Sequence, residues 1–121
     1  MKLKFIETHP ERAKLTIVVN KYGGVYFNIH TVKFLGLTEA NSLLLALDED
    51  DKSNKVFYAS VSVKGEKGSY RLSQCNSTPN LQMNIKAILD ILNLPFRTEK
   101  LVFAVSKETI NDEYFIKFTL L

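Results

Sequence analysis

Acidic side chains are most concentrated in one short run, Asp48-Glu49-Asp50-Asp51. Such a run could bind calcium or supply paired catalytic carboxylates. An EF-hand loop, however, needs a glycine at its sixth position and a glutamate at its twelfth, with a helix on either side. Counted from Asp48, these positions hold Ser53 and Ala59, and strand-type residues flank the run. We therefore interpret the run as a solvated turn between two strands.

The other reactive side chains are few and scattered. His9 and His30 are the only histidines, and they lack the spacing of a zinc-binding helix. Cys75 is the only cysteine, which excludes an internal disulfide and a cysteine-built zinc site. Gly23-Gly24 opens no phosphate-binding motif, so a hairpin turn explains it better. We expect no catalytic residues, no metal and no cofactor, and hence no enzyme.

Basic and aromatic side chains near two expected hairpins are the remaining candidates for function. Lysine and arginine could contact phosphates, and an exposed aromatic ring could stack on a base. The candidate nucleic-acid-binding residues are Lys14, Lys21, Tyr22, Lys33, Arg71 and Lys86. Tyr26 and Phe27 could extend the aromatic surface, with Asn20 and Asn76 as polar partners. The alternative is that the lysines only confer solubility and that these two rings belong to the core.

Composition limits the class of protein. The chain has 121 residues, of which 45% are hydrophobic and 24% charged, values typical of one globular domain. Its net charge of +3 permits DNA binding without indicating it, since only three of the sixteen basic residues are arginine. No apolar run approaches the roughly 18 residues of a membrane helix, and no signal-peptide cleavage site is evident. We expect a cytoplasmic protein with no membrane contact and no small-molecule substrate.

Hydrophobic periodicity predicts short strands and two short helices. The strands are expected over 14–19, 25–27, 43–47, 56–63, 70–73, 81–83, 101–105 and 114–120. Asn28 is placed as the N-cap of the first helix, which Gly36 ends in the left-handed conformation. Asn84 is placed as the second N-cap, before a core-facing stripe of Ile85, Ile88, Leu89 and Leu92. The run 43–47 is interpreted as buried on both faces, and 107–113 as a polar turn.

The same order of elements occurs twice along the chain. Asn28-Ile29 corresponds to Asn84-Ile85, and the flanking strands follow in similar register. We predict an α+β domain of two ββαββ repeats related by a pseudo-twofold axis. The boundaries are an N-terminal arm over 1–13, a first repeat over 14–63 and a second over 64–121. The alternative is an α+β domain whose halves look alike because short strands and helices are common.

One stretch of the first repeat carries a family pattern. It runs from Gly23-Gly24-Val25 through Asn28-Ile29 and Leu35-Gly36-Leu37 into a strand that ends at Asp48. This stretch resembles the AbrB/SpoVT family of swapped-hairpin DNA-binding domains. The resemblance implies a fold that interleaves two copies of the unit, and a chain with both copies is similar to the tandem members. It also implies DNA binding.

The departures from that family fall on its DNA-contacting arginines. Their positions hold Gly24, Val32 and Lys33, and the second repeat offers only Lys86 on its helix. The leading hypothesis is a small DNA-binding transcriptional regulator that contacts phosphates, in a form that could dimerise. The alternative is a protein-interaction or structural module that kept the fold and lost DNA binding. Such a module would use an apolar surface or a strand edge near Tyr114–Leu120.

Overall fold

The computed structural model describes residue 2 and residues 15–63, 65–75 and 80–121. The described strands are β1 (Thr16–Val19), β2 (Gly24–Phe27), β3 (Asn41–Ala46), β4 (Val56–Val63), β5 (Tyr70–Arg71), β6 (Ser73–Gln74), β7 (Leu81–Asn84), β8 (Leu101–Ile110) and β9 (Glu113–Leu120). The helices are α1 (Ile29–Leu35) and α2 (Lys86–Ile91). Most of the expected N-terminal arm, and Lys14 with it, lies outside the described residues.

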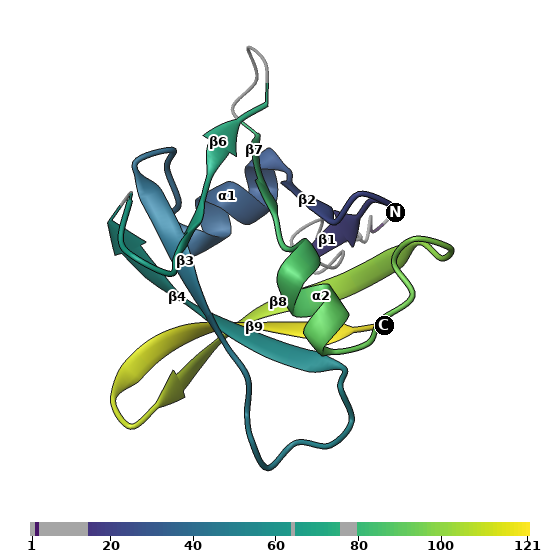
Figure 1. The fold of residues 1–121 in the computed structure, drawn as a ribbon. Coiled ribbons are helices and arrows are strands. Elements are labelled where there is room, and N and C mark those ends of the chain that lie inside the picture. Colours follow the sequence, from purple (N-terminus) through teal and green to yellow (C-terminus); the bar gives the residue numbers. More distant parts are fainter. Residues whose placement is uncertain (1, 3–14, 64, 76–79) are drawn as a thin grey trace.

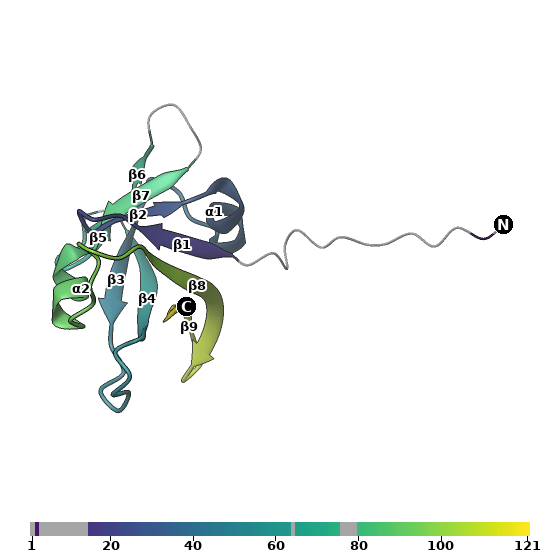
Figure 2. The same ribbon diagram turned by 90° about the vertical axis from the view of Figure 1, so that its right-hand side faces the viewer.

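All nine strands belong to one antiparallel sheet, in the order β5-β3-β4-β9-β8-β1-β2-β7-β6. The two strands at the ends of this order, β5 and β6, are separated in the chain by Leu72 alone. Because β5 pairs with β3 and β6 pairs with β7, this short stretch joins the two ends of the sheet. The result is a nearly closed, barrel-like sheet with the two helices beside it (Figures 1 and 2).

The prediction of an α+β fold built from two ββαββ repeats was wrong. Of the described residues, 47% lie in strands and only 13% in helices, so the sheet and not a helix layer dominates the fold. Several strand pairs join the two halves of the chain, since β1 pairs with β8, β2 with β7 and β4 with β9. The sequence pattern located the two short helices correctly. It overestimated the helices' share of the fold, because backbone pairing between distant strands leaves no local signal in the sequence.

Side chains fill the inside of the sheet. Phe57 of β4 stacks on Phe118 of β9, with ring centroids 4.6 Å apart, and meets the edge of Phe103 at 5.2 Å. These three rings come from neighbouring strands and are fully buried. Phe27 of β2 reaches the same group through an edge contact with Phe118. An aromatic cluster therefore ties β2 to the β4–β9–β8 part of the sheet.

The first helix follows its local sequence signals closely. The Asn28 side chain accepts a hydrogen bond from the Thr31 amide at 2.9 Å, as expected for an N-cap. Gly36 has φ +66°, and the Leu37 amide donates to the Val32 carbonyl at 3.1 Å. These contacts satisfy backbone groups at both helix ends, which confirms the predicted caps.

Two expectations about strands were wrong. Residues 107–113 are not a polar turn, because β8 continues to Ile110 and pairs with β9 up to the pair Ile110–Glu113. The turn is only Asn111-Asp112, both with positive φ, which is typical of a two-residue type I′ hairpin turn. The run 43–47 is not buried on both faces either: Leu43 is buried, whereas Leu47 lies beyond β3 and is exposed.

The second helix provides a matched test of core packing. Leu89 is fully buried, whereas Ile91, two residues further along, is 71% exposed. We predict that Leu89→Ala lowers the free energy of unfolding by about 2–5 kcal/mol, because it leaves a cavity in the core. Ile91→Ala should change it by less than about 1 kcal/mol. Urea denaturation of both variants measures the difference, and equal losses would contradict this packing of α2.

Candidate nucleic-acid interface

The β1–β2 turn is organised by the side chain of Asn20. Its Oδ1 accepts hydrogen bonds from the amides of Tyr22 and Gly24, each at 2.9 Å. The Asn20 backbone closes the turn by accepting from the Gly23 amide at 3.0 Å and donating to the Gly24 carbonyl at 2.9 Å. The side-chain oxygen of Asn20, considered above as a polar partner for nucleic acid, is therefore engaged in shaping the turn.

This turn contacts the start of α2, which follows it by about 60 residues in the chain. The Ile85 amide donates to the Gly23 carbonyl at 2.8 Å, and Asn84 Nδ2 donates to the Tyr22 carbonyl at 2.9 Å. The prediction of Asn84 as the N-cap was wrong by one residue, because Ile85 holds the N-cap position; Asn84 Oδ1 still accepts from the Lys86 amide at 3.0 Å. One backbone and one side-chain hydrogen bond thus hold the turn beside the N-cap of α2.

Three of the six predicted site residues meet at this contact. Lys21, Tyr22 and Lys86 line an open cleft of about 420 Å³, together with Phe96 and Arg97. Tyr22 is 69% exposed, and the Lys21 ammonium lies 5.2 Å from the centre of its ring. We call the four polar members of this lining, Lys21, Tyr22, Lys86 and Arg97, the turn–helix cluster.

Arg97 was not predicted, and it differs from the two lysines in its surroundings. Its guanidinium lies over the buried Phe96 ring, 4.3 Å from the centre, and pairs with both carboxylate oxygens of Asp90 at 2.9 and 3.3 Å. The hydrogen bonds from Arg97 hold the pKa of Asp90 below its ordinary value. Because one carboxylate already neutralises Arg97, Lys21 and Lys86 are the cations of the cluster most available to an anion.

The remaining predicted residues do not join the cluster. Lys33 lies in the last turn of α1 and Arg71 lies in β5, and neither lines the cleft. Lys14 and Asn76 lie outside the described residues. The alternative that placed both Tyr26 and Phe27 in the core was right only for Phe27, which is buried; Tyr26 is exposed on β2 and accepts a hydrogen bond from the Asn80 side chain.

The acidic run forms hydrogen bonds within its own loop. Asp48 Oδ1 accepts from the Asp50 amide at 2.9 Å, and Asp51 Oδ1 accepts from the Ser53 amide at 2.8 Å. Hydrogen bonds from Ser53 lower the pKa of Asp51. Within the described part of the chain, no three His, Cys, Asp or Glu side chains gather closely enough to hold a metal ion. In the same part, no helix is long and apolar enough to cross a membrane.

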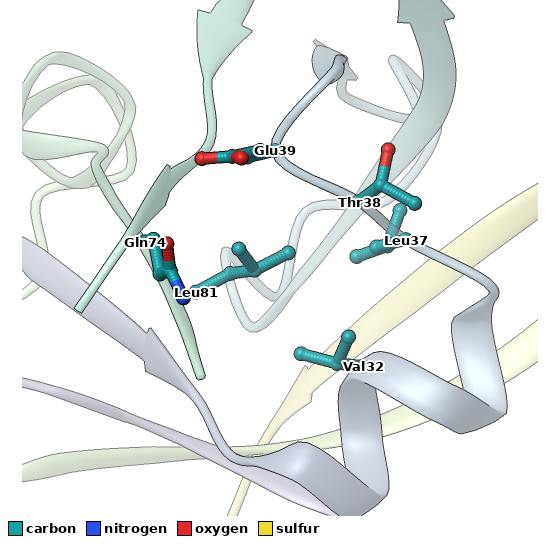
Figure 3. Close-up of a pocket in the computed structure, with 6 residues that line it drawn as sticks. All are labelled: Val32, Leu37, Thr38, Glu39, Gln74 and Leu81. Atoms are coloured by element: carbon teal, nitrogen blue, oxygen red, sulfur yellow. The ribbon is translucent and has the colours of Figure 1, made fainter. Parts of the chain in front are cut away.

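A smaller pocket of about 160 Å³ lies between α1, the link that follows it and the β6–β7 hairpin (Figure 3). Val32, Leu37 and Leu81 provide apolar side chains, while Glu39 contributes the only carboxylate of its lining. Because the lining holds a single carboxylate and no histidine or second acid, it does not form an acid–base pair. The turn–helix cluster therefore remains the best-supported polar site.

Comparison of the chain with protein-family models, with curated proteins and with solved structures returned no match. The resemblance to the AbrB/SpoVT family consequently stays a prediction from the sequence.

The contact between the turn and α2 predicts an unusual sensitivity at Gly23. Its φ is +84°, and a Cβ there would lie 2.8 Å from Lys86 Cα. Gly68 has a similar φ of +81° but open space around it. We predict that Gly68→Ala costs about 1 kcal/mol of stability from backbone strain alone, and that Gly23→Ala costs more than that. Thermal unfolding of both variants tests this, and equal costs would mean that α2 does not sit against the turn.

The ion pair beside the cleft gives a second prediction. In Arg97→Gln, the pKa of Asp90 should rise towards its ordinary value, since its main hydrogen-bond donor is gone. Because the pKa of Asp90 is lower in the folded state, the pair stabilises the fold at neutral pH. That contribution is lost as the pH falls through the folded-state pKa. Carbon-detected NMR titration measures the shift, with Asp51 as an internal control that should not respond.

Proposed function

We propose that this protein is a small, non-enzymatic DNA-binding regulator whose turn–helix cluster contacts the phosphate backbone. The observation that supports it is the meeting of Lys21, Tyr22 and Lys86, selected from the sequence as separate candidates, around one cleft. Two segments far apart in the chain supply these side chains, and hydrogen bonds from the Ile85 amide and the Asn84 side chain hold the segments together. A preformed arrangement of cations lowers the entropic cost of binding an extended anion.

The chemistry of the cluster favours phosphate contact over base recognition. Bidentate recognition of guanine is chiefly an arginine function, and the guanidinium of Arg97 is already paired with Asp90. Lysine ammonium groups act instead as mobile point charges on phosphate. The exposed ring of Tyr22 can pack on a sugar or stack on an unpaired base. We therefore infer weak binding with little dependence on the DNA sequence.

The number of cations sets the expected salt dependence. Each phosphate neutralised on duplex DNA contributes a slope of about −0.9 to the logarithm of the affinity against the logarithm of salt concentration. Two available lysines predict a slope of about −2 for one chain. A homodimer would present two clusters and about twice that slope.

A second candidate function, binding of a protein partner, has its own structural support. The strand edge considered for this role, Tyr114–Leu120, is mostly occupied, because Ile116–Thr119 of β9 pair with β4. Only the beginning of β9 remains open on that side, where β4 and β9 diverge. A groove lies at that opening, and its lining shares no residue with the turn–helix cluster.

Fluorescence anisotropy with labelled duplex and single-stranded DNA at several salt concentrations tests the proposal. The double variant Lys21→Gln/Lys86→Gln should bind more weakly and lose about two units of the salt slope. The matched control is Lys52→Gln/Lys55→Gln, which removes the same charge from the β3–β4 loop and should bind as the wild type does. Absence of wild-type binding at low salt, or equal losses in both variants, would refute DNA binding through this cluster.

A further inference from the structure

The ladder between β4 and β9 ends early, although both strands continue. Its described pairs run from Val56–Thr119 to Ala59–Ile116, and the next pairs in register would join residues 60 and 61 to residues 115 and 114. They do not form, although β4 extends to Val63 and β9 starts at Glu113. Figure 1 shows why: the β8–β9 hairpin turns to the lower left, away from the end of β4.

The divergence leaves backbone groups of both strands without strand partners. The Leu120 amide donates to the Lys55 carbonyl at 2.7 Å, which fixes the alternation of the ladder. In an antiparallel pair, every second residue directs its N–H and C=O towards the neighbouring strand. Counting from Lys55 and Leu120, the backbone groups of Val61 and Tyr114 face the opening. A sheet edge of this kind is a template for an added strand.

The side chains at the opening continue the inner face of the sheet into solvent. Along β4, Phe57 and Ala59 are buried, but the next inward-facing residues, Val61 and Val63, are 48% and 73% exposed. Tyr114 of β9 is 78% exposed. The apolar inner face of the sheet is therefore exposed to solvent at this end. Exposed apolar surface that continues a core is typical of a protein-binding site.

The opening is also a groove with one cation on its wall. Its volume is about 510 Å³, and its lining residues are Leu35, Ala59, Val61, Lys107, Tyr114, Phe115 and Ile116. Lys107 lies opposite Ile116 in the β8–β9 ladder, and its ammonium sits over the Phe34 ring at 4.6 Å. Among the described residues, Lys107 forms no ion pair with a carboxylate; the β8–β9 pair is between Lys117 and Glu108. An apolar groove with this cation complements a ligand that carries an acidic group.

We propose that this groove binds an extended peptide segment of a partner protein by strand addition to the Ser60–Val63 edge of β4. Alternate apolar side chains of the segment would cover Val61 and Val63, and one acidic side chain would pair with Lys107. The open backbone groups favour a peptide over a fatty acid, because only a peptide can complete the interrupted ladder. The inference is independent of DNA binding, since the two surfaces share no residue.

The test uses fluorescein-labelled, end-capped octapeptides of alternating valine and threonine, with one aspartate moved along the sequence. At least one of these should bind the full chain, as measured by anisotropy. Hydrogen exchange should then slow at the amides of Val61 and Val63. Lys107→Glu should weaken the binding about tenfold, equal to about 1.4 kcal/mol. Lys52→Glu makes the same charge change outside the groove and should leave the affinity unaltered.

A charge exchange distinguishes a direct contact from a structural effect of the substitution. Lys107→Glu should bind the corresponding lysine peptide more tightly than the wild type does, which a variant that merely unfolds would not do. Val63→Arg, at an exposed position, should block both peptides while leaving the circular dichroism spectrum unchanged. Failure of all peptides to bind, or binding indifferent to residue 107, would overturn the proposal.

A second copy of the chain is the competing occupant. Sedimentation would then show a wild-type dimer that Val63→Arg converts to a monomer, and this result would also overturn the peptide proposal. DNA binding by the same samples reports separately on the turn–helix cluster, so failure of one proposal leaves the other measurable.

Discussion

Backbone hydrogen bonding between the two halves of the chain is the constraint on which the structure depends. The β1–β2 hairpin pairs on one side with β8 and on the other with β7, both from the second half. β4 and β9 add a third such pair, and β3 and β5 a fourth. The helices have seven and six residues, too few to be stable alone. The aromatic core and both surface sites therefore exist only once the halves have paired.

Both candidate binding surfaces follow from this pairing. The turn–helix cluster forms because the ladder between β2 and β7 brings the β1–β2 turn to the start of α2. The apolar groove forms because the ladder between β4 and β9 stops after four residue pairs. At the turn–helix cluster, pairing between the halves brings polar groups together. At the groove, the interruption of that pairing exposes the inner face of the sheet. The fold thereby places the two proposed binding surfaces on separate sets of residues.

Local features of the fold could be predicted from the sequence, and non-local ones could not. The caps of α1 depend on Asn28 and Gly36 alone, so their residue types were sufficient. The buried stripe of α2 could likewise be predicted from the spacing of its apolar residues. Residues 107–113 look like a turn because they are mostly polar, yet pairing with β9 makes them strand up to Ile110. The true turn is Asn111-Asp112, where both residues have positive φ. Asn and Asp tolerate this conformation better than most residues, so this dipeptide was the local signal for the turn.

The site was predicted only in part for the same reason. Lys21 and Lys86 were identified as basic residues near expected hairpins, but their proximity depends on a hydrogen bond between Ile85 and Gly23. Arg97 was missed because it follows the helix in an irregular link, and its approach to the cleft depends on the burial of the neighbouring Phe96. The adjacent pair Phe96-Arg97, after Pro95, was the one available signal. No local pattern marks the groove, because it results from a ladder that does not form.

The strand order also governs when the chain can fold during its synthesis. Thr16 of β1 pairs with Ala104 of β8, so β1 lacks this neighbouring strand until the chain has been synthesised as far as β8. Until both β7 and β8 have been synthesised, the β1–β2 hairpin lacks at least one of its two neighbouring strands, and apolar residues such as Val25 and Phe27 are incompletely covered. Contacts of such high sequence separation slow folding, because the loop between them must close first. A nascent chain is therefore open to unwanted strand pairing along the β1–β2 hairpin until β7 and β8 have been synthesised.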